Sequence, residues 1–136
     1  MSKVAIITAR GGSKRIPRKN IKDFCGKPII AYSIEAALAS GLFDEVMVST
    51  DDKEIADVAR TYGASVPFMR SEATSGDYAT SGDVLTEVLS EYRVRGCDFD
   101  VLACIYPTAP FMTAEELRNA ARFLENPETN AVVAVT

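Results

Sequence analysis

The sequence predicts an α/β fold in which helices cover both faces of a mostly parallel sheet. Short apolar runs of strand length recur along the chain, and segments with helical spacing lie between them. Continuous apolar runs are typical of strands that are buried on both faces, because a half-exposed strand would alternate apolar and polar residues. The alternation of the two patterns favours parallel strands that are joined by helices.

The elements can be assigned in order along the chain. The apolar runs that predict strands cover residues 3–8 (KVAIIT), 45–49 (EVMVS), 100–106 (DVLACIY) and 131–135 (AVVAV), and a weaker strand is expected over 65–69. Helical spacing covers residues 28–40 with Gly41 as its stop, 51–62 with Gly63 as its stop, about 82–95, and about 114–124. Together these elements predict one Rossmann-like domain over residues 1–136, which ends inside its last strand and lacks a closing helix.

The composition limits the chemistry that this domain can perform. The chain has 136 residues, of which 47% are apolar and 25% charged, with no bilayer-length apolar run and no secretory leader, so we expect a cytoplasmic protein. Histidine is absent, which excludes the commonest general base and the commonest zinc ligand. The cysteines Cys25, Cys97 and Cys104 lack metal-ligand spacing and are interpreted as buried or incidental thiols.

The positive charge of the chain is concentrated in one segment. Residues 10–27 hold seven basic side chains and one acid, a local charge of +6 in a chain whose net charge is -4. A nucleic-acid-binding protein usually spreads its positive charge over a broad face. This short basic segment instead favours a compact polyanion such as a triphosphate.

The first predicted strand is followed by the loop ARGGSKRIPRKN, residues 9–20. Gly11 and Gly12 allow backbone N–H groups to approach a phosphate, and Arg10, Lys14 and Lys19 offer cationic donors. The loop has neither the spacing of a Walker P-loop nor that of the GxGxxG fingerprint, which disfavours an NAD-dependent oxidoreductase. A solvated basic turn is the structural alternative to a phosphate site.

The run ARGGSKRIPRKNI, followed by GKP at residues 26–28, resembles the opening signature of the CMP-sialate and CMP-pseudaminate synthetases, which form the acylneuraminate cytidylyltransferase family. The resemblance implies a fold of the nucleotide-diphospho-sugar transferase type. It also implies that Arg10 and Lys19 are catalytic and stabilise charge on the phosphates of CTP. In the same loop it implies substrate-binding roles for Gly11, Gly12, Ser13 and Asn20, the last at the nucleotide ribose.

Three later segments carry the same resemblance: STDD (49–52), VPFMR (66–70) and DYATSGD (77–83). The resemblance implies that Arg70 reaches the cytosine ring and that Ala79 contacts the nucleoside. Asp51 stands three residues before Glu54, which is the spacing of a helix N-cap. We therefore expect Asp51 to cap the next helix and leave it off the catalytic residues.

The segment YPTAPF, residues 106–111, follows the fourth apolar run. Sialate synthetases carry a QPTSP-like segment here, whereas this chain has Tyr106 and Ala109 in place of Gln and Ser. The departure resembles the pseudaminate branch and puts any role of that glutamine in doubt. Tyr106 and Thr108 join the candidate substrate-binding residues, while Thr113 and Glu116 predict a capping box for the following helix.

The resemblance implies attack by the anomeric hydroxyl of a nonulosonic acid, with pseudaminic acid favoured, on the α-phosphorus of CTP. Mg²⁺ is the expected cofactor, a homodimer the expected assembly of the longer family members, and neither a nucleic acid nor a membrane an expected partner. No metal ligand can be assigned. N-acetylneuraminic acid as the substrate is one alternative, and a truncated CTP-binding module without turnover is another, because family members extend beyond residue 136.

Overall fold

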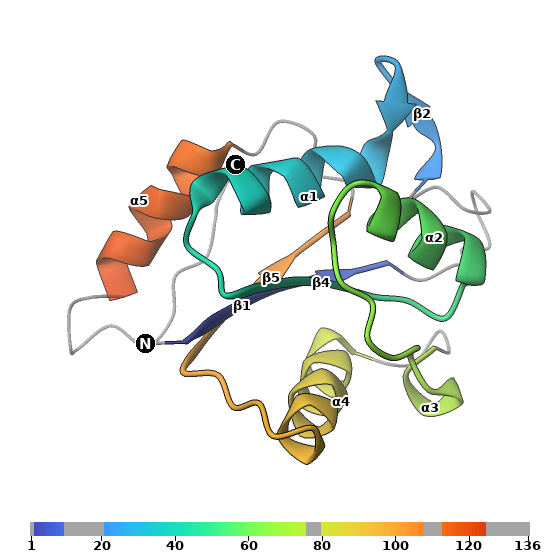
Figure 1. The fold of residues 1–136 in the computed structure, drawn as a ribbon, viewed down its shortest axis with the longest axis vertical. Coiled ribbons are helices and arrows are strands. Elements are labelled where there is room, and N and C mark those ends of the chain that lie inside the picture. The colour runs from blue at the N-terminus through green and yellow to red at the C-terminus, as the bar shows by residue number, and fades with distance from the viewer. Residues whose placement is uncertain (1, 10–20, 76–79, 108–112, 125–136) are drawn as a thin grey trace.

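The computed structural model describes residues 2–9, 21–75, 80–107 and 113–124 (Figure 1). Their elements are, in chain order, β1 (Lys3–Thr8), β2 (Asp23–Phe24), β3 (Lys27–Pro28), α1 (Ile29–Ser40), β4 (Glu45–Ser49), α2 (Lys53–Thr61), α3 (Glu72–Ser75), α4 (Ser81–Val94), β5 (Val101–Ile105) and α5 (Ala114–Leu124). The longer strands and helices fall within two residues of their predicted bounds. The strand predicted at 131–135 lies outside the described residues.

The main sheet has the strand order β4-β1-β5, and both pairings are parallel. β1 lies in the centre because its apolar side chains can be covered on both faces: Val4, Ala5, Ile6 and Ile7 are fully buried. Along the chain, β1 leads to β4 through the β2–β3 segment and α1. β4 then leads to β5 through α2, α3 and α4. This arrangement confirms the predicted parallel α/β fold.

Alternate residues of the strands lie in two separate hydrophobic cores, because successive side chains of a strand point to opposite faces of the sheet. On one face Ala5 and Ile7 of β1 pack with Ile34 of α1 and Ile55 of α2. On the other face Val4 and Ile6 pack with apolar residues of α4, namely Val84, Val88 and Tyr92. Figure 1 shows the resulting layers, with α1 and α2 on one side of the sheet and α4 on the other.

The helix stops that the sequence predicted at glycines are confirmed for α1 and α2. Gly41 takes a left-handed φ of 68° at the end of α1, and its N–H donates to the carbonyl of Leu38. Gly63 follows α2 with a φ of 101°. Both conformations suit glycine because other L-residues adopt them only with strain.

Three local features differ from the predictions. β2 and β3 form a short antiparallel hairpin, whose turn residues Cys25 and Gly26 have φ of 52° and 97°, and it directly follows the basic loop. The strand predicted over 65–69 is reduced to a single bridge between Ser65 and Met47. The single turn α3 was not predicted at all, because four residues are too few to show a helical period.

The three cysteines are exposed free thiols, so of the two interpretations, buried or incidental, the buried one is wrong. Cys25 occupies the turn of the hairpin, where its side chain is exposed. Among the residues that the structure describes, no helix has the length and apolar character needed to cross a bilayer.

Candidate active site at the carboxyl edge of the sheet

Most of the predicted site lies outside the described residues. This applies to Arg10, Gly11, Gly12, Ser13, Lys19, Asn20, Ala79 and Thr108, whose roles stay predictions. Arg70 and Tyr106 are described, as are the strand ends from which all the predicted loops start. The geometry of the site is therefore built from these ends.

The three parallel strands end at one level of the sheet. Thr8 of β1 pairs with Ser49 of β4, and Ile7 pairs with Ile105 of β5. Ala9, which precedes the basic loop, and Tyr106 consequently leave the sheet at the same edge. Ligands of open parallel α/β sheets bind at the carboxyl ends of the strands, which is the edge formed here.

Arg70 lies at this edge and is tied to the end of β4. Its backbone N–H donates to the carbonyl of Thr50 at 2.8 Å, its Nη2 to the carbonyl of Ser49 at 2.9 Å, and its Nε to Ser49 Oγ at 3.2 Å. The Ser49 carbonyl also accepts the N–H of Ala9 at 2.9 Å. The guanidinium group thus shares an acceptor with the first residue of the basic loop, although the two residues are far apart in sequence.

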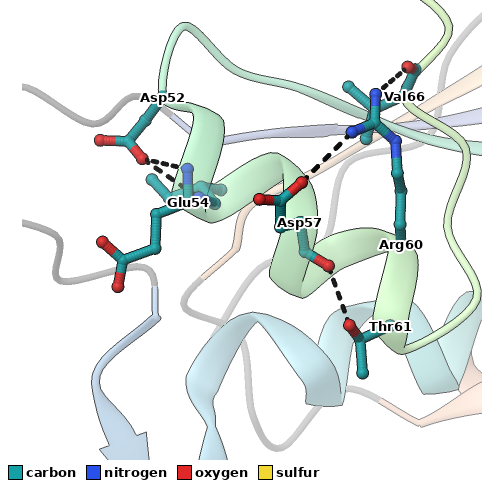
Figure 2. A network of polar contacts seen from close by, with 7 residues as sticks. Asp52, Glu54, Asp57, Arg60, Thr61 and Val66 are labelled. Atoms are coloured by element: carbon teal, nitrogen blue, oxygen red, sulfur yellow. Dashed lines mark hydrogen bonds and ion pairs between the residues drawn. The ribbon is translucent and has the colours of Figure 1, made fainter.

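The chain that leads to Arg70 is itself fixed against α2 (Figure 2). Arg60 Nη2 donates to the carbonyl of Val66 at 2.8 Å, and Arg60 Nη1 lies 3.5 Å from the carboxylate of Asp57. Arg60 and Asp57 both belong to α2, so this helix carries both members of the ion pair. The contact anchors the segment 64–66 four residues before Arg70.

Tyr106 leaves β5 at the same edge with its side chain 61% exposed. Its backbone carbonyl accepts a hydrogen bond from Ser33 Oγ of α1 at 2.9 Å, and Ser33 is fully buried. The following residue, Pro107, is buried as well. The backbone of Tyr106 is therefore held from α1 while its side chain remains exposed at the carboxyl edge of the sheet.

The helix cap at the end of the STDD segment is Asp52, so the prediction that Asp51 caps the helix is wrong. Asp52 Oδ1 accepts the N–H groups of Glu54 at 2.9 Å and Ile55 at 3.1 Å (Figure 2). Asp52 has the extended backbone that a cap requires, with φ -109° and ψ 122°, and α2 starts directly after it. The exposed Asp51 is therefore not the N-cap residue of α2.

Two polar features next to the site were missed from the sequence. Thr80 and Asp83 form a reciprocal capping box at the start of α4, a signal that the T-x-x-D spacing of the DYATSGD segment does contain. Glu87 of α4 accepts hydrogen bonds from Ser71 and Thr74 beside Arg70. No sequence pattern pointed to this second cluster, because its members are joined only by the packing of α3 on α4.

The described residues contain no group of three or more histidine, cysteine or carboxylate side chains that would hold a metal ion. A Mg²⁺ ion that arrives on a triphosphate needs only one or two protein carboxylates. The described part of the site therefore identifies no metal ligand.

Comparisons with known proteins give the family. A family model described as cytidylyltransferase matches residues 4–135. The chain is 50% identical over 127 residues to the pseudaminic acid cytidylyltransferase of Campylobacter jejuni subsp. jejuni serotype O:2, which covers 93% of this chain and 55% of that protein. It is 44% identical to the CMP-N,N'-diacetyllegionaminic acid synthase of Legionella pneumophila, over 86% of this chain and 50% of the relative.

A solved structure supports the same assignment. The structure of CMP:2-keto-3-deoxy-manno-octonic acid synthetase complexed with CTP matches with a TM-score of 0.78 and 26% identity, over 94% of this chain and 49% of the other. The chain spans about half the length of the curated relatives that it matches. The parallel sheet, the polar residues at its carboxyl edge and the match over residues 4–135 together show that the chain belongs to the cytidylyltransferase family.

Proposed function

We propose that the protein transfers CMP from CTP to an acidic nine-carbon sugar, pseudaminic acid, and releases pyrophosphate. The observation that carries this proposal is the 50% identity to a pseudaminic acid cytidylyltransferase across 93% of the chain. The geometry supports it, because Arg70 and the start of the basic loop share the Ser49 carbonyl as an acceptor at the edge where parallel sheets bind nucleotides.

In the proposed reaction the anomeric oxygen of the sugar forms a bond to the α-phosphorus of CTP, and the bond between the α- and β-phosphates breaks. Such a substitution requires alignment and charge neutralisation more than covalent help from the protein. Arg10 and Lys19 would neutralise the phosphates, Ser13 would orient them, and Gly11 and Gly12 would let the backbone approach. Asn20 and Ala79 would hold the nucleoside, with Tyr106 and Thr108 on the sugar side.

Arg70 is proposed to read the pyrimidine. A buried cytosine needs donors for its ring oxygen and for N3, whereas uracil carries an N–H at position 3 that opposes a donor. A guanidinium group provides several donors in a fixed plane. The contacts of Arg70 with the Ser49 carbonyl and Ser49 Oγ hold that plane at the end of β4. With Arg70 donating to N3, we expect the protein to prefer CTP over UTP.

Mg²⁺, a cytoplasmic location and a homodimer belong to the same proposal. When bound, Mg²⁺ would neutralise charge on the phosphates of CTP and help to align them. We assign no described residue as its ligand, since the described carboxylates do not gather into a metal-binding group.

Calorimetric titration with CTP, UTP, ATP and GTP tests the nucleotide part of the proposal. Arg10→Ala and Arg70→Ala should each weaken CTP binding about tenfold, because each removes a charge-assisted or buried hydrogen bond. Arg118→Ala is the matched control, since Arg118 also donates to backbone carbonyls, those of Ala39 and Ser40, but at the end of α1. Equal binding of all four triphosphates, or unchanged CTP affinity in both site variants, would refute the nucleotide assignment.

Pyrophosphate release tests the transfer itself. In a form as long as the curated relatives, we expect release with CTP, Mg²⁺ and pseudaminic acid and slower release with N-acetylneuraminic acid. The exposed ring of Tyr106 is less polar than the glutamine of sialate synthetases and would penalise the less polar sugar less. A preference for N-acetylneuraminic acid would overturn the choice of sugar. Binding of CTP without any release would favour the alternative of a module without turnover.

A further inference from the structure

Glu87 of α4 has both of its carboxylate oxygens engaged by residues that come sixteen and thirteen positions earlier. The N–H of Ser71 donates to Oε1 at 2.9 Å, Ser71 Oγ donates to Oε2 at 2.7 Å, and Thr74 Oγ1 donates to Oε2 at 2.8 Å. Thr74 is buried, so its hydroxyl needs a partner within the protein. The carboxylate therefore fixes the turn α3 onto α4.

The same turn holds one side of Arg70. Arg70 Nη1 lies 3.5 Å from the carbonyl of Thr74, while Nε and Nη2 contact Ser49. Thr74 thus presents its hydroxyl to Glu87 and its carbonyl to Arg70. A helix of one turn has little stability of its own, so the position of the Thr74 carbonyl depends on what anchors α3.

Glu87 also lies within electrostatic range of Arg70. Burial raises the pKa of Glu87, but the hydrogen bonds from Ser71 and Thr74 and the positive charge of Arg70 lower it by more, so the pKa lies below its ordinary value. Glu87 is consequently ionised at neutral pH and attracts the guanidinium group. The other carboxylates of α4 near it have partners elsewhere: Asp83 accepts from the N–H of Thr80, and Glu91 pairs with Arg95.

We propose that Glu87 is a positioning residue that sets the orientation of Arg70 toward the pyrimidine, by holding the Thr74 carbonyl and by balancing the charge of the guanidinium group. This role rests on the proposed function, in which Arg70 reads cytosine. It predicts that a substitution of Glu87 alters the choice between CTP and UTP. A residue that merely stabilised the fold would lower the apparent affinity for both nucleotides alike, because a smaller folded fraction weakens the binding of either one by the same factor.

The test is a double-mutant cycle on the purified protein, with CTP and UTP affinities measured by calorimetry. Glu87→Gln should weaken CTP binding by about threefold or more and reduce the CTP-over-UTP preference, as is typical for coupled neighbours. In the Arg70→Ala background the same substitution should have no further effect on that preference. Glu91→Gln is the matched control, since it removes a carboxylate one turn along α4 that pairs with Arg95, and it should leave both affinities unchanged.

The outcomes separate this inference from the function on which it rests. Unchanged CTP affinity and preference in Glu87→Gln, or equal losses with and without Arg70, would overturn the positioning role and leave the nucleotide assignment standing. Absence of any CTP preference in the unmodified protein would overturn both. If circular dichroism shows that Glu87→Gln does not fold, Ser71→Ala replaces it in the cycle. This variant removes the hydroxyl that donates to Glu87 and keeps the backbone N–H of residue 71. An unchanged CTP-over-UTP preference in Ser71→Ala would refute the positioning role equally.

Discussion

Asp52 offers a direct test of how the STDD segment is built, through the substitution Asp52→Ala. The Asp52 carboxylate accepts two N–H groups from the first turn of α2, those of Glu54 and Ile55. Alanine would leave both groups without this acceptor and would remove a negative charge from the helix N-terminus, where it is favourable. The helix has nine residues, too few to be stable in isolation, so the cap matters for its formation.

The expected cost follows from these two contributions. Replacing an aspartate cap by alanine costs about 0.5 to 2 kcal/mol, and two well-formed hydrogen bonds place this site in the upper half of that range. For a chain of this size, a loss of about 1 to 2 kcal/mol lowers the midpoint of thermal unfolding by about 3 to 8 °C. Asp52→Asn should lose far less, because asparagine is as good a cap as aspartate.

Thermal and urea unfolding, followed by circular dichroism, measure this cost. Asp51→Ala is the control, since the neighbouring carboxylate is not the cap of α2. We expect the free energy of unfolding to fall more in Asp52→Ala than in Asp51→Ala. A larger loss in Asp51→Ala, or no loss in Asp52→Ala, would refute the assignment of the cap and return that role to Asp51.

Two further predictions concern parts of the fold away from the site. Gly41→Ala should lower the free energy of unfolding in urea by about 1 kcal/mol, because the left-handed φ of 68° disfavours any residue with a side chain. Steric contact is not the cause, since nothing lies within 4 Å of the added Cβ. An unchanged urea midpoint would contradict the backbone strain. Burial, together with the charge and hydrogen bond of Glu45, raises the pKa of Tyr92 above its ordinary 10.0. The folded state therefore keeps a proton that the unfolded chain releases, so the free energy of unfolding should fall as the pH rises above about 10. Tyr92→Phe should make this fall smaller when thermal unfolding is measured across the same pH range.

The sequence was sufficient for the fold because the strands are buried on both faces. Ile6 and Ile7 of β1 enter opposite cores, so the strand appears in the sequence as a continuous apolar run of recognisable length. The hairpin of β2 and β3 has two residues in each strand, which is too short for any period. Residues 65–69 carry apolar side chains but only Ser65 pairs with β4, because the pairing of a peripheral strand depends on tertiary contacts.

The sequence indicated candidate site residues only where they belong to a local sequence motif. Arg70 and Tyr106 could be proposed because each follows an apolar segment and belongs to a recognisable motif. Both lie at the carboxyl edge of the sheet, and their roles stay predictions. The choice between Asp51 and Asp52 was not decidable from spacing, since either residue can precede a helix that starts within two positions. The contacts of Glu87 could not be predicted from the sequence, because a glutamate on an amphipathic helix is ordinarily part of the solvated face.

The anchors of Arg70 differ in kind, and this difference determines how its position can be altered. The Ser49 carbonyl belongs to the strand ladder and also receives the N–H of Ala9, so its place is set by the sheet. The Thr74 carbonyl belongs to a single helical turn that is held through side chains, and Glu87 is central to that hold. A substitution can therefore shift the α3 side of the guanidinium group while the strand side stays fixed. Because the contacts at Ser49 stay fixed, such a substitution would rotate the guanidinium group about them and change its orientation before the protein lost its fold.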